Sequence, residues 1–252
     1  MEAMMPAFLP DLPEARILAA LSRAPGHPVR SGKFDAAESS AALVANAFGW
    51  FLERPGMLPA LPGVPAGAVE TVDLAVEMRF PWSGGRHPWL DVGIGTRTTL
   101  VGVSSTRYEP YRPGKQTGFS EVYDRPAWGP NMGRYTALAR GLIEGTVGYR
   151  SLDAALLIKQ AYGLRTRAEK RALGSVLVYL YAEPEAWASG KPVDAARKAE
   201  HRAEVAAFAE AVAGDEVVFV PLCWGDLLRQ WEAEPALRGH VAALRARFGA
   251  LG

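Results

Sequence analysis

The sequence predicts an α/β fold in which a mixed central sheet is flanked by helices. Short segments with strand-like patterns, either continuously apolar or alternating between apolar and polar residues, recur along the chain. Segments with apolar residues at helical spacing lie between them. Strands that alternate with helices are typical of α/β domains, and 252 residues are enough to bury a substantial core.

We expect a single domain over residues 1–252, because no internal repeat or low-complexity segment divides the sequence. Residues 1–34 are predicted to form an N-terminal helix and a connector, residues 35–222 the core, and residues 223–252 the C-terminal helices. Residues 55–68 hold four prolines and three glycines, which predicts a surface loop.

Composition bears on the partners and the compartment of the protein. The formal net charge is +1, so a nucleic-acid partner would have to bind a local basic patch. A single cysteine, Cys223, excludes an intramolecular disulfide and fits a reducing compartment. We find no signal-peptide pattern and no apolar run near the roughly 20 residues of a membrane span. We therefore expect a cytoplasmic protein without a membrane partner, and the Ala, Arg, Gly and Pro enrichment suggests a bacterial source.

Helices and strands can be assigned from these patterns. A helix is expected within 12–24, and another that opens at Asp35 or Ser39 and ends before Pro55. Further helices are expected at 132–144, 154–173, 195–213, 224–231 and 235–248. Strands are expected at 71–80, 89–93, 100–108, 175–181 and 217–222.

The strands at 89–93 and 100–108 are predicted to form a hairpin, with the turn at 95–98. Asp91 lies within the first strand, and the second strand changes from apolar to polar at Ser104. A carboxylate on one strand of a hairpin beside polar residues on the other is the layout of metal-dependent phosphodiesterases. We expect Asp91 and Ser104 on adjacent strands.

The period of two along a strand predicts which side chains share a face. Ser104 and Thr106 are predicted to lie on one face of the sheet, while Ser105, Arg107 and Glu109 lie on the other. A bulge would be needed to bring Glu109 or Arg107 to the face of Ser104.

Glu38 is expected in the first turn of the helix that opens at Asp35 or Ser39. There it could complement the helix dipole, or it could supply a second carboxylate to a metal site beside Asp91. The sequence alone favours neither role.

Basic residues supply the candidates for contacts with nucleic acid. The second half of the 154–173 segment is basic, which fits either phosphate binding beside the cleft or a solvated helix end. The candidate nucleic-acid-binding residues are Arg79, Arg86, Arg107, Arg165, Arg167 and Lys170.

The chain resembles bacterial restriction-endonuclease-like proteins of the PD-(D/E)XK nuclease superfamily. The matching segments are residues 32–34, 38–43, 79–82, 84–91, 107–112, 152–155, 163–166 and 178–184. The resemblance implies a restriction-endonuclease-like core, double-stranded DNA as partner, and Mg²⁺ or Mn²⁺ held by Asp91 and a helix-borne Glu38.

The sequence departs from the family pattern where the chemistry is expected. The family's Glu-Ser-Lys is replaced by Ser104-Ser105-Thr106, and Leu156 stands where a Gln is expected, with Gln160 one turn on. A serine hydroxyl is a weaker metal ligand than a carboxylate, and a threonine cannot supply an ammonium charge. Lys115, in a following loop, is the remaining lysine that could reach back.

Two functions stay open after this comparison. The first is a catalytically impaired or inactive pseudo-nuclease that binds DNA or a partner. The second is an active Mg²⁺-dependent DNA endonuclease with a rearranged site built from Glu38, Asp91 and Lys115. No other catalytic set competes, because the four histidines lack metal-ligand spacing and Cys223 has no neighbouring base in the sequence. A protein partner and the oligomeric state are left undetermined.

Overall fold

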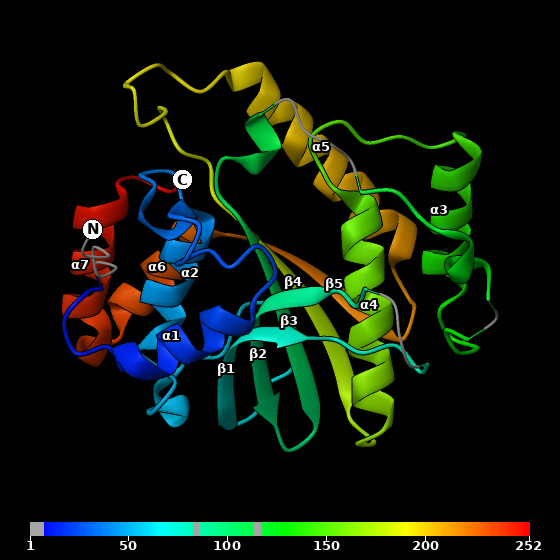
Figure 1. Cartoon of the computed structure of the whole chain (residues 1–252), viewed down its shortest axis with the longest axis horizontal. Helices are drawn as coiled ribbons and strands as arrows, with labels where there is room; N and C mark the ends of the chain where they lie inside the picture. Colours follow the sequence, from blue (N-terminus) through cyan, green and yellow to red (C-terminus); the bar gives the residue numbers. More distant parts are fainter. Residues whose placement is uncertain (1–7, 83–85, 113–116, 126) are drawn as a thin grey trace.

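The computed structural model describes residues 8–82, 86–112, 117–125 and 127–252. Its centre is a five-stranded mixed sheet with the strand order β1-β2-β3-β4-β5, which confirms the predicted α/β fold (Figure 1). The strands are β1 (Val69–Glu77), β2 (Trp89–Thr96), β3 (Thr99–Thr106), β4 (Gly174–Tyr181) and β5 (Val217–Cys223). The first three strands are antiparallel, whereas β3, β4 and β5 are parallel to one another.

The helices lie close to their predicted positions. They are α1 (Glu14–Arg23), α2 (Ser40–Gly49), α3 (Gly133–Glu144), α4 (Ala154–Glu169), α5 (Ala195–Val212), α6 (Trp224–Ala233) and α7 (Arg238–Phe248). Short 3₁₀ segments occur at Lys33–Asp35, Pro55–Met57, Glu109–Tyr111, Glu121–Asp124 and Pro235–Leu237. Ser39 caps α2 by accepting a hydrogen bond from the Ala42 N–H, and Asp153 caps α4 by accepting one from the Leu156 N–H.

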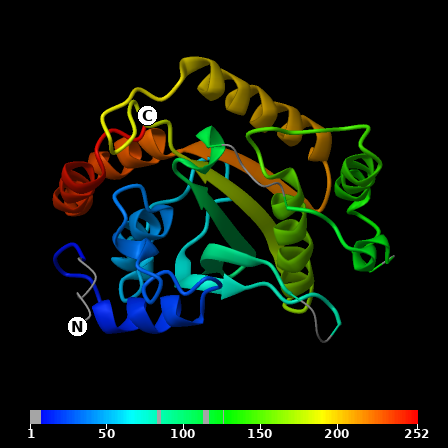
Figure 2. The same cartoon turned by 45° about the horizontal axis from the view of Figure 1, so that its top comes forward.

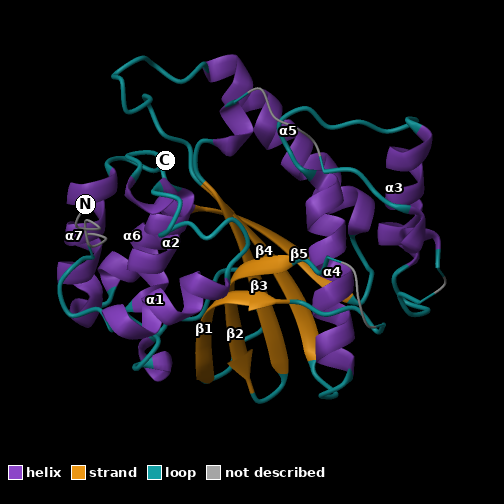
Figure 3. Ribbon diagram, in the orientation of Figure 1, coloured by secondary structure: helices purple, strands orange, loops and turns teal. Residues whose placement is uncertain are grey.

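Helices cover both faces of the sheet (Figure 2, Figure 3). One face packs against α1, α2, α6 and α7, where Trp231 contacts Phe48 and Phe51 edge-on. The other packs against α3, α4 and α5, where the rings of Trp128 and Tyr162 stack with centroids 4.1 Å apart. Burying large apolar side chains on both faces is what an interleaved α/β sequence requires.

Small residues bring α4 close to the sheet. A Cβ on Gly102 of β3 would lie 2.3 Å from Leu90 and 3.3 Å from Leu164 of α4. A Cβ on Gly163 of α4 would lie 2.7 Å from the backbone of Met78. Because these positions leave no room for a side chain, α4 is fixed against β3 and against the end of β1.

The direction of α4 decides which of its ends approaches the hairpin's polar residues. Since β3 and β4 are parallel and α4 precedes β4, the helix runs back along the sheet. The Gly174 N–H, just after α4, donates to the Thr98 carbonyl in the hairpin turn at 2.8 Å. The predicted basic helix end therefore lies at the turn end of the hairpin, and the first half of α4 lies at the end where β3 finishes.

Candidate functional site

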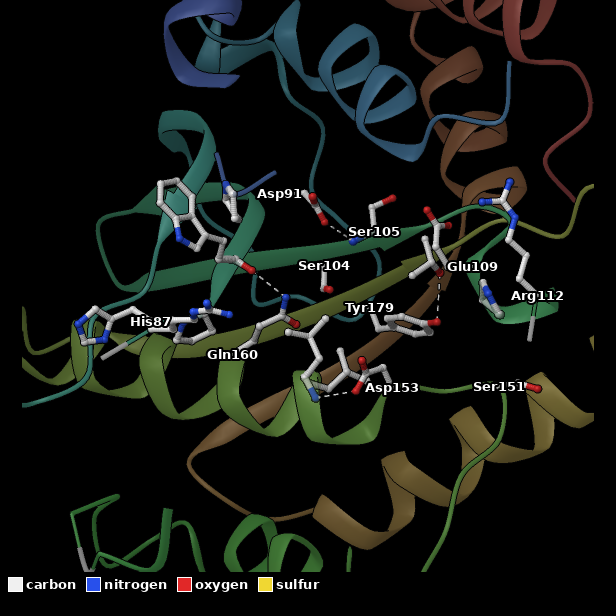
Figure 4. A pocket seen from close by; sticks show the side chains of 18 of the residues that line it. His87, Asp91, Ser104, Ser105, Glu109, Arg112, Ser151, Asp153, Gln160 and Tyr179 are labelled. Atoms are coloured by element: carbon white, nitrogen blue, oxygen red, sulfur yellow. Dashed lines mark hydrogen bonds between the residues drawn. The ribbon is translucent and has the colours of Figure 1, made fainter. Parts of the chain in front are cut away.

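A cavity of about 950 Å³ opens where β3 ends, beside the first half of α4 (Figure 4). Its volume falls in the range typical of small-molecule sites, roughly 300–1,000 Å³. Polar side chains on its wall include Glu77, Asp91, Ser104, Thr106, Glu109, Gln160 and Tyr179. The predicted hairpin thus places Asp91 and Ser104 on adjacent strands and in one cavity.

Asp91 lies where the pairing of β2 and β3 ends. The last paired residues are Val92 and Val103, and beyond them the Ser105 N–H donates to Asp91 Oδ2 at 2.7 Å. Burial raises the pKa of the Asp91 carboxyl to about 6; the hydrogen bond from Ser105 lowers it, and the negative charge of Glu109 raises it further. The Asp91 carboxylate makes no ion pair with any cation in the described part of the chain.

Asp91 should reduce stability once it ionises. Its folded-state pKa lies above the ordinary 3.8, so its contribution favours the folded state below about pH 4 and is lost as the pH rises through 6. Asp91→Asn keeps an acceptor for Ser105 and stays neutral. We expect it to exceed the wild type in free energy of unfolding at pH 7.5 by on the order of 2 kcal/mol, and to flatten the pH dependence between 4 and 6.

Urea unfolding at pH 4 and pH 7.5 measures this difference. The matched control is Asp226→Asn, because the Asp226 side chain is 58% exposed. Equal stability of Asp91→Asn and the wild type at pH 7.5 would contradict the assignment of a costly, half-buried charge to Asp91.

Ser104 and Thr106 share one face of β3, as predicted from the period of two. Ser104 is buried at 5% exposure and faces the cavity. Thr106 Oγ1 donates to the Tyr179 hydroxyl at 3.1 Å, and that hydroxyl lies 2.9 Å from His201 Nε2. Burial lowers the pKa of His201 to about 4, so the imidazole is neutral at pH 7.

Ser105 lies on the opposite face, again as predicted. Its hydroxyl accepts a hydrogen bond from the Trp224 indole at 3.0 Å, on the side covered by α6. Ser105 also lines the cavity, so the cavity reaches both sides of β3 where the strand ends.

Glu109 lines the cavity, as Ser105 also does. Its carboxylate is turned towards the start of α2, on the side of Ser105 and away from Ser104, which agrees with the face predicted from the period of two. The Glu109 carboxylate accepts hydrogen bonds from the Arg107 and Tyr108 N–H groups at 2.7 and 3.0 Å, and from the Ser40 hydroxyl at 2.6 Å.

Glu38 is not a helix-borne ligand beside Asp91, and the prediction that it joins Asp91 in a metal site is wrong for this structure. It precedes the Ser39 cap, outside α2, and does not line the cavity. One carboxylate oxygen pairs with Arg112, and the other accepts from the Ala188 N–H at 2.9 Å. Lys115, the lysine predicted to reach back to the site, lies outside the described residues.

Two of the predicted nucleic-acid-binding arginines are buried and bonded to other groups of the protein. Arg107 is 3% exposed, and its guanidinium donates to the Ala37 and Phe248 carbonyls at 2.7 and 2.6 Å. Arg165 is 8% exposed and pairs with Glu169 and Glu216. The prediction of phosphate contacts is wrong for both, because neither guanidinium is free to meet a ligand from solvent.

The other predicted cations are divided between the cavity and the rest of the surface. Arg86 is exposed and lines the cavity. Arg79 is exposed, is not part of the cavity wall, and pairs with Glu77 at 2.9 Å. Arg167 and Lys170 lie at the far end of α4, so the predicted basic patch beside the cleft is not formed there.

Two arginines that the sequence did not single out reach the cavity rim. Arg112 lies over the Trp187 ring, 5.6 Å from its centroid, and its side chain is 47% exposed. Arg150 is 86% exposed at its side chain, and Glu204 holds its loop by accepting a hydrogen bond from the Arg150 N–H at 2.6 Å. Both lie in irregular segments, where no periodic pattern predicts which way a side chain points. Their place at the cavity could therefore not be predicted from the sequence.

Gln160, the glutamine one turn beyond Leu156, also lines the cavity. It lies on α4 and points into the cavity (Figure 4), where its amide nitrogen donates to the Trp89 carbonyl at 2.8 Å. The family resemblance expected a glutamine near the start of this helix, and the helical turn between 156 and 160 keeps Gln160 on the cavity side.

The described residues do not fit a divalent metal ion. No group of three or more His, Cys, Asp or Glu side chains that could hold one is found among them. Asp91 stands beside the hydroxyl of Ser104, while Glu38 is engaged elsewhere and Glu109 already accepts three hydrogen bonds. Mg²⁺ is usually held by one or two carboxylates with water in its other positions, so Asp91 by itself gives the ion a weak site.

Comparisons with protein-family models, curated proteins and solved structures find no match to this chain. Across the described residues, no helix is both long and apolar enough to cross a membrane.

Proposed function

We propose that this chain is a divergent PD-(D/E)XK nuclease-like protein that has lost metal-dependent hydrolysis and uses its cavity for binding. The observation that carries the proposal is the pair of neutral hydroxyls, Ser104 and Thr106, on the cavity face of β3 beside Asp91. The antiparallel hairpin followed by parallel strands agrees with the core that the resemblance implies.

The chemistry of phosphodiester hydrolysis supports this choice. The reaction needs a metal to activate water and a cation to stabilise the developing negative charge. Thr106 supplies no cation and is tied to Tyr179, and Ser104 offers a neutral hydroxyl where a carboxylate ligand is expected. A site of this composition is better suited to binding than to hydrolysis.

Double-stranded DNA is the partner we propose for the cavity rim. Arg86, Arg112 and Arg150 line the cavity, and the side chains of Arg86 and Arg150 are exposed. Arginines at an opening can position a nucleic-acid backbone without reading its sequence.

The test of the DNA proposal is duplex binding measured by fluorescence anisotropy over a range of salt concentrations. We expect Arg86→Ala/Arg150→Ala to weaken binding and to reduce the slope of log K against log salt by about 2, because each lost phosphate contact removes about 0.9. The control is Arg229→Ala/Arg238→Ala, which removes two exposed arginines outside the cavity. Equal losses from both pairs would contradict a DNA site at this rim.

The loss of hydrolysis is tested by calorimetric Mn²⁺ titration and by plasmid nicking of the wild type. We expect no saturable Mn²⁺ binding and no nicking. The alternative, an Mg²⁺-dependent endonuclease with a rearranged site, draws on the presence of Glu109 in the cavity of Asp91. Nicking that Glu109→Gln and Asp91→Asn each abolish would establish that alternative and overturn our proposal.

A further inference from the structure

A second cavity, of about 160 Å³, lies between α1, α2 and the strands β1 and β2. We call it the apolar recess, because its wall carries apolar side chains such as Leu21, Val44 and Leu74. Asp91 is the one charged residue among the described residues that line it. An apolar cavity of about 150 Å³ is large enough to hold a benzene molecule, so the recess can take a small hydrocarbon body.

A break in the pattern of β1 leaves this space open. Leu74 packs in the core beneath α1 and α2, whereas Val76, two residues on, packs against the core on the opposite face. Ala75 between them has a φ of 50°, in the left-handed region that residues other than glycine rarely adopt. The strand pairing places Ala75 opposite Asp91, and both line the recess. Backbone strain of this kind is concentrated at functional sites.

The Asp91 carboxylate has one oxygen left for a ligand. Oδ2 accepts the Ser105 N–H, and Oδ1 has no hydrogen-bond partner among the described residues. The side chain is half-buried, and Oδ1 is not one of the fully buried, unpaired atoms of the described residues, so a ligand can reach it. Figure 4 shows the carboxylate on the α2 side of β3. Asp91, Pro25 and Trp89 also line the larger cavity, so the two cavities adjoin here.

The charge of Asp91 is not offset by the described part of the chain. Burial, and after it the negative charge of Glu109, raise the pKa of the Asp91 carboxyl, and no cation acts on it. A metal ion fits poorly, because the apolar wall supplies no further oxygen ligands. An organic cation with an apolar body matches both the carboxylate and the wall.

We propose that the apolar recess binds a compact organic amine. The ammonium group donates one N–H to Asp91 Oδ1, and the hydrocarbon body, no larger than a benzene ring, packs against Leu21, Val44 and Leu74. The other N–H groups face the adjoining larger cavity, where water can accept from them. The inference goes beyond the proposed function, because it needs neither DNA nor a metal ion.

The test is an NMR titration of the ¹⁵N-labelled full chain with cyclopentylammonium chloride, at pH 7.5 in a buffer with a metal chelator. We expect saturable shifts of the Ala75 and Ser105 N–H signals, with a dissociation constant on the order of 1 mM. Cyclopentanol keeps the body without the charge, and methylammonium keeps the charge without the body. Each should bind at least about tenfold more weakly, because it lacks one half of the match.

Two variants locate the ligand. Asp91→Asn removes the charge and should weaken binding at least about tenfold. Ala41→Leu fills the recess from α2 while Asp91 stays in place, and it should weaken binding by about the same factor. Ala207→Leu is the matched control, because Ala207 is exposed on α5, outside the recess, and it should leave binding unchanged.

The pH dependence is a third readout. At pH 5 the Asp91 carboxyl, with its pKa of about 6, is mostly protonated while the amine stays charged. The wild type should therefore bind about tenfold more weakly than at pH 7.5, and Asp91→Asn should show no such change. Glu109→Gln should keep the dependence, because Glu109 is the neighbouring acid and not the ligand's partner.

The inference is overturned by a lack of saturable cyclopentylammonium binding, by equal binding of cyclopentanol or methylammonium, or by unchanged binding in Asp91→Asn. Equal losses in Ala41→Leu and Ala207→Leu would also overturn it. If Ala41→Leu does not fold, Asp91→Asn still decides, since we expect that variant to be more stable than the wild type. Failure of the proposed function would show separately, as equal losses of DNA binding from both arginine pairs or as nicking by the wild type.

Discussion

Replacing Arg107 with alanine should lower the free energy of unfolding by about 3 kcal/mol or more. The guanidinium leaves the end of β3 and donates to the Ala37 carbonyl before α2 and to the Phe248 carbonyl at the end of α7. It also lies over the Tyr108 and Phe248 rings, 4.9 and 5.4 Å from their centroids. Hydrogen bonds from a charged group contribute about 1.5–3 kcal/mol each, and their loss leaves two carbonyls without this donor.

Denaturant unfolding monitored by tryptophan fluorescence measures this loss. Arg107→Lys keeps the charge but lacks the fork that reaches two carbonyls, so its stability should fall between those of the alanine variant and the wild type. Arg79→Ala is the control, with an expected change within about 0.5 kcal/mol because its side chain is 75% exposed. A change below about 1 kcal/mol in Arg107→Ala would contradict the role of Arg107 as a buried link between β3, α2 and α7.

The sequence predicted the strands and helices well because their patterns are local. Alternation and apolar runs fix which residues face the core, and the same period placed Ser104 and Thr106 on one face and Ser105 on the other. The period of two could not show what each side chain would meet. Arg107 lies on the face of Ser105, as predicted, but its guanidinium is buried against the Ala37 and Phe248 carbonyls and does not reach solvent.

Long-range arrangement was harder to predict. The basic residues of α4 looked suitable for phosphate binding, but the parallel pairing of β3 and β4 sends that end of the helix away from Asp91. Charge alone also could not show that Arg165 would pair with Glu216, which is 51 positions along the chain. The rim arginines Arg112 and Arg150 are positioned by contacts with Glu38 and Glu204 that no local pattern encodes.

Placing the Glu and Lys of the family pattern at positions 104 and 106 should give the protein metal binding. We expect Ser104→Glu/Thr106→Lys to bind Mn²⁺ with a dissociation constant below about 1 mM in calorimetric titration, where the wild type shows no saturable binding. Both positions face the cavity beside Asp91, so the new carboxylate would give the ion a second acidic ligand. Plasmid nicking assayed alongside should rise above the wild-type background.

The double change also carries structural costs that the experiment has to separate from metal binding. Thr106→Lys removes the hydrogen bond to Tyr179, Ser104→Glu places a carboxylate at a position 5% exposed, and Leu156 on the cavity wall limits the space. Circular dichroism and thermal melting therefore accompany each titration. Adding Asp91→Asn to the double variant should abolish the new binding, because the ion then loses its resident carboxylate. A folded double variant that binds no Mn²⁺ would show that this cavity does not retain the geometry of a metal site.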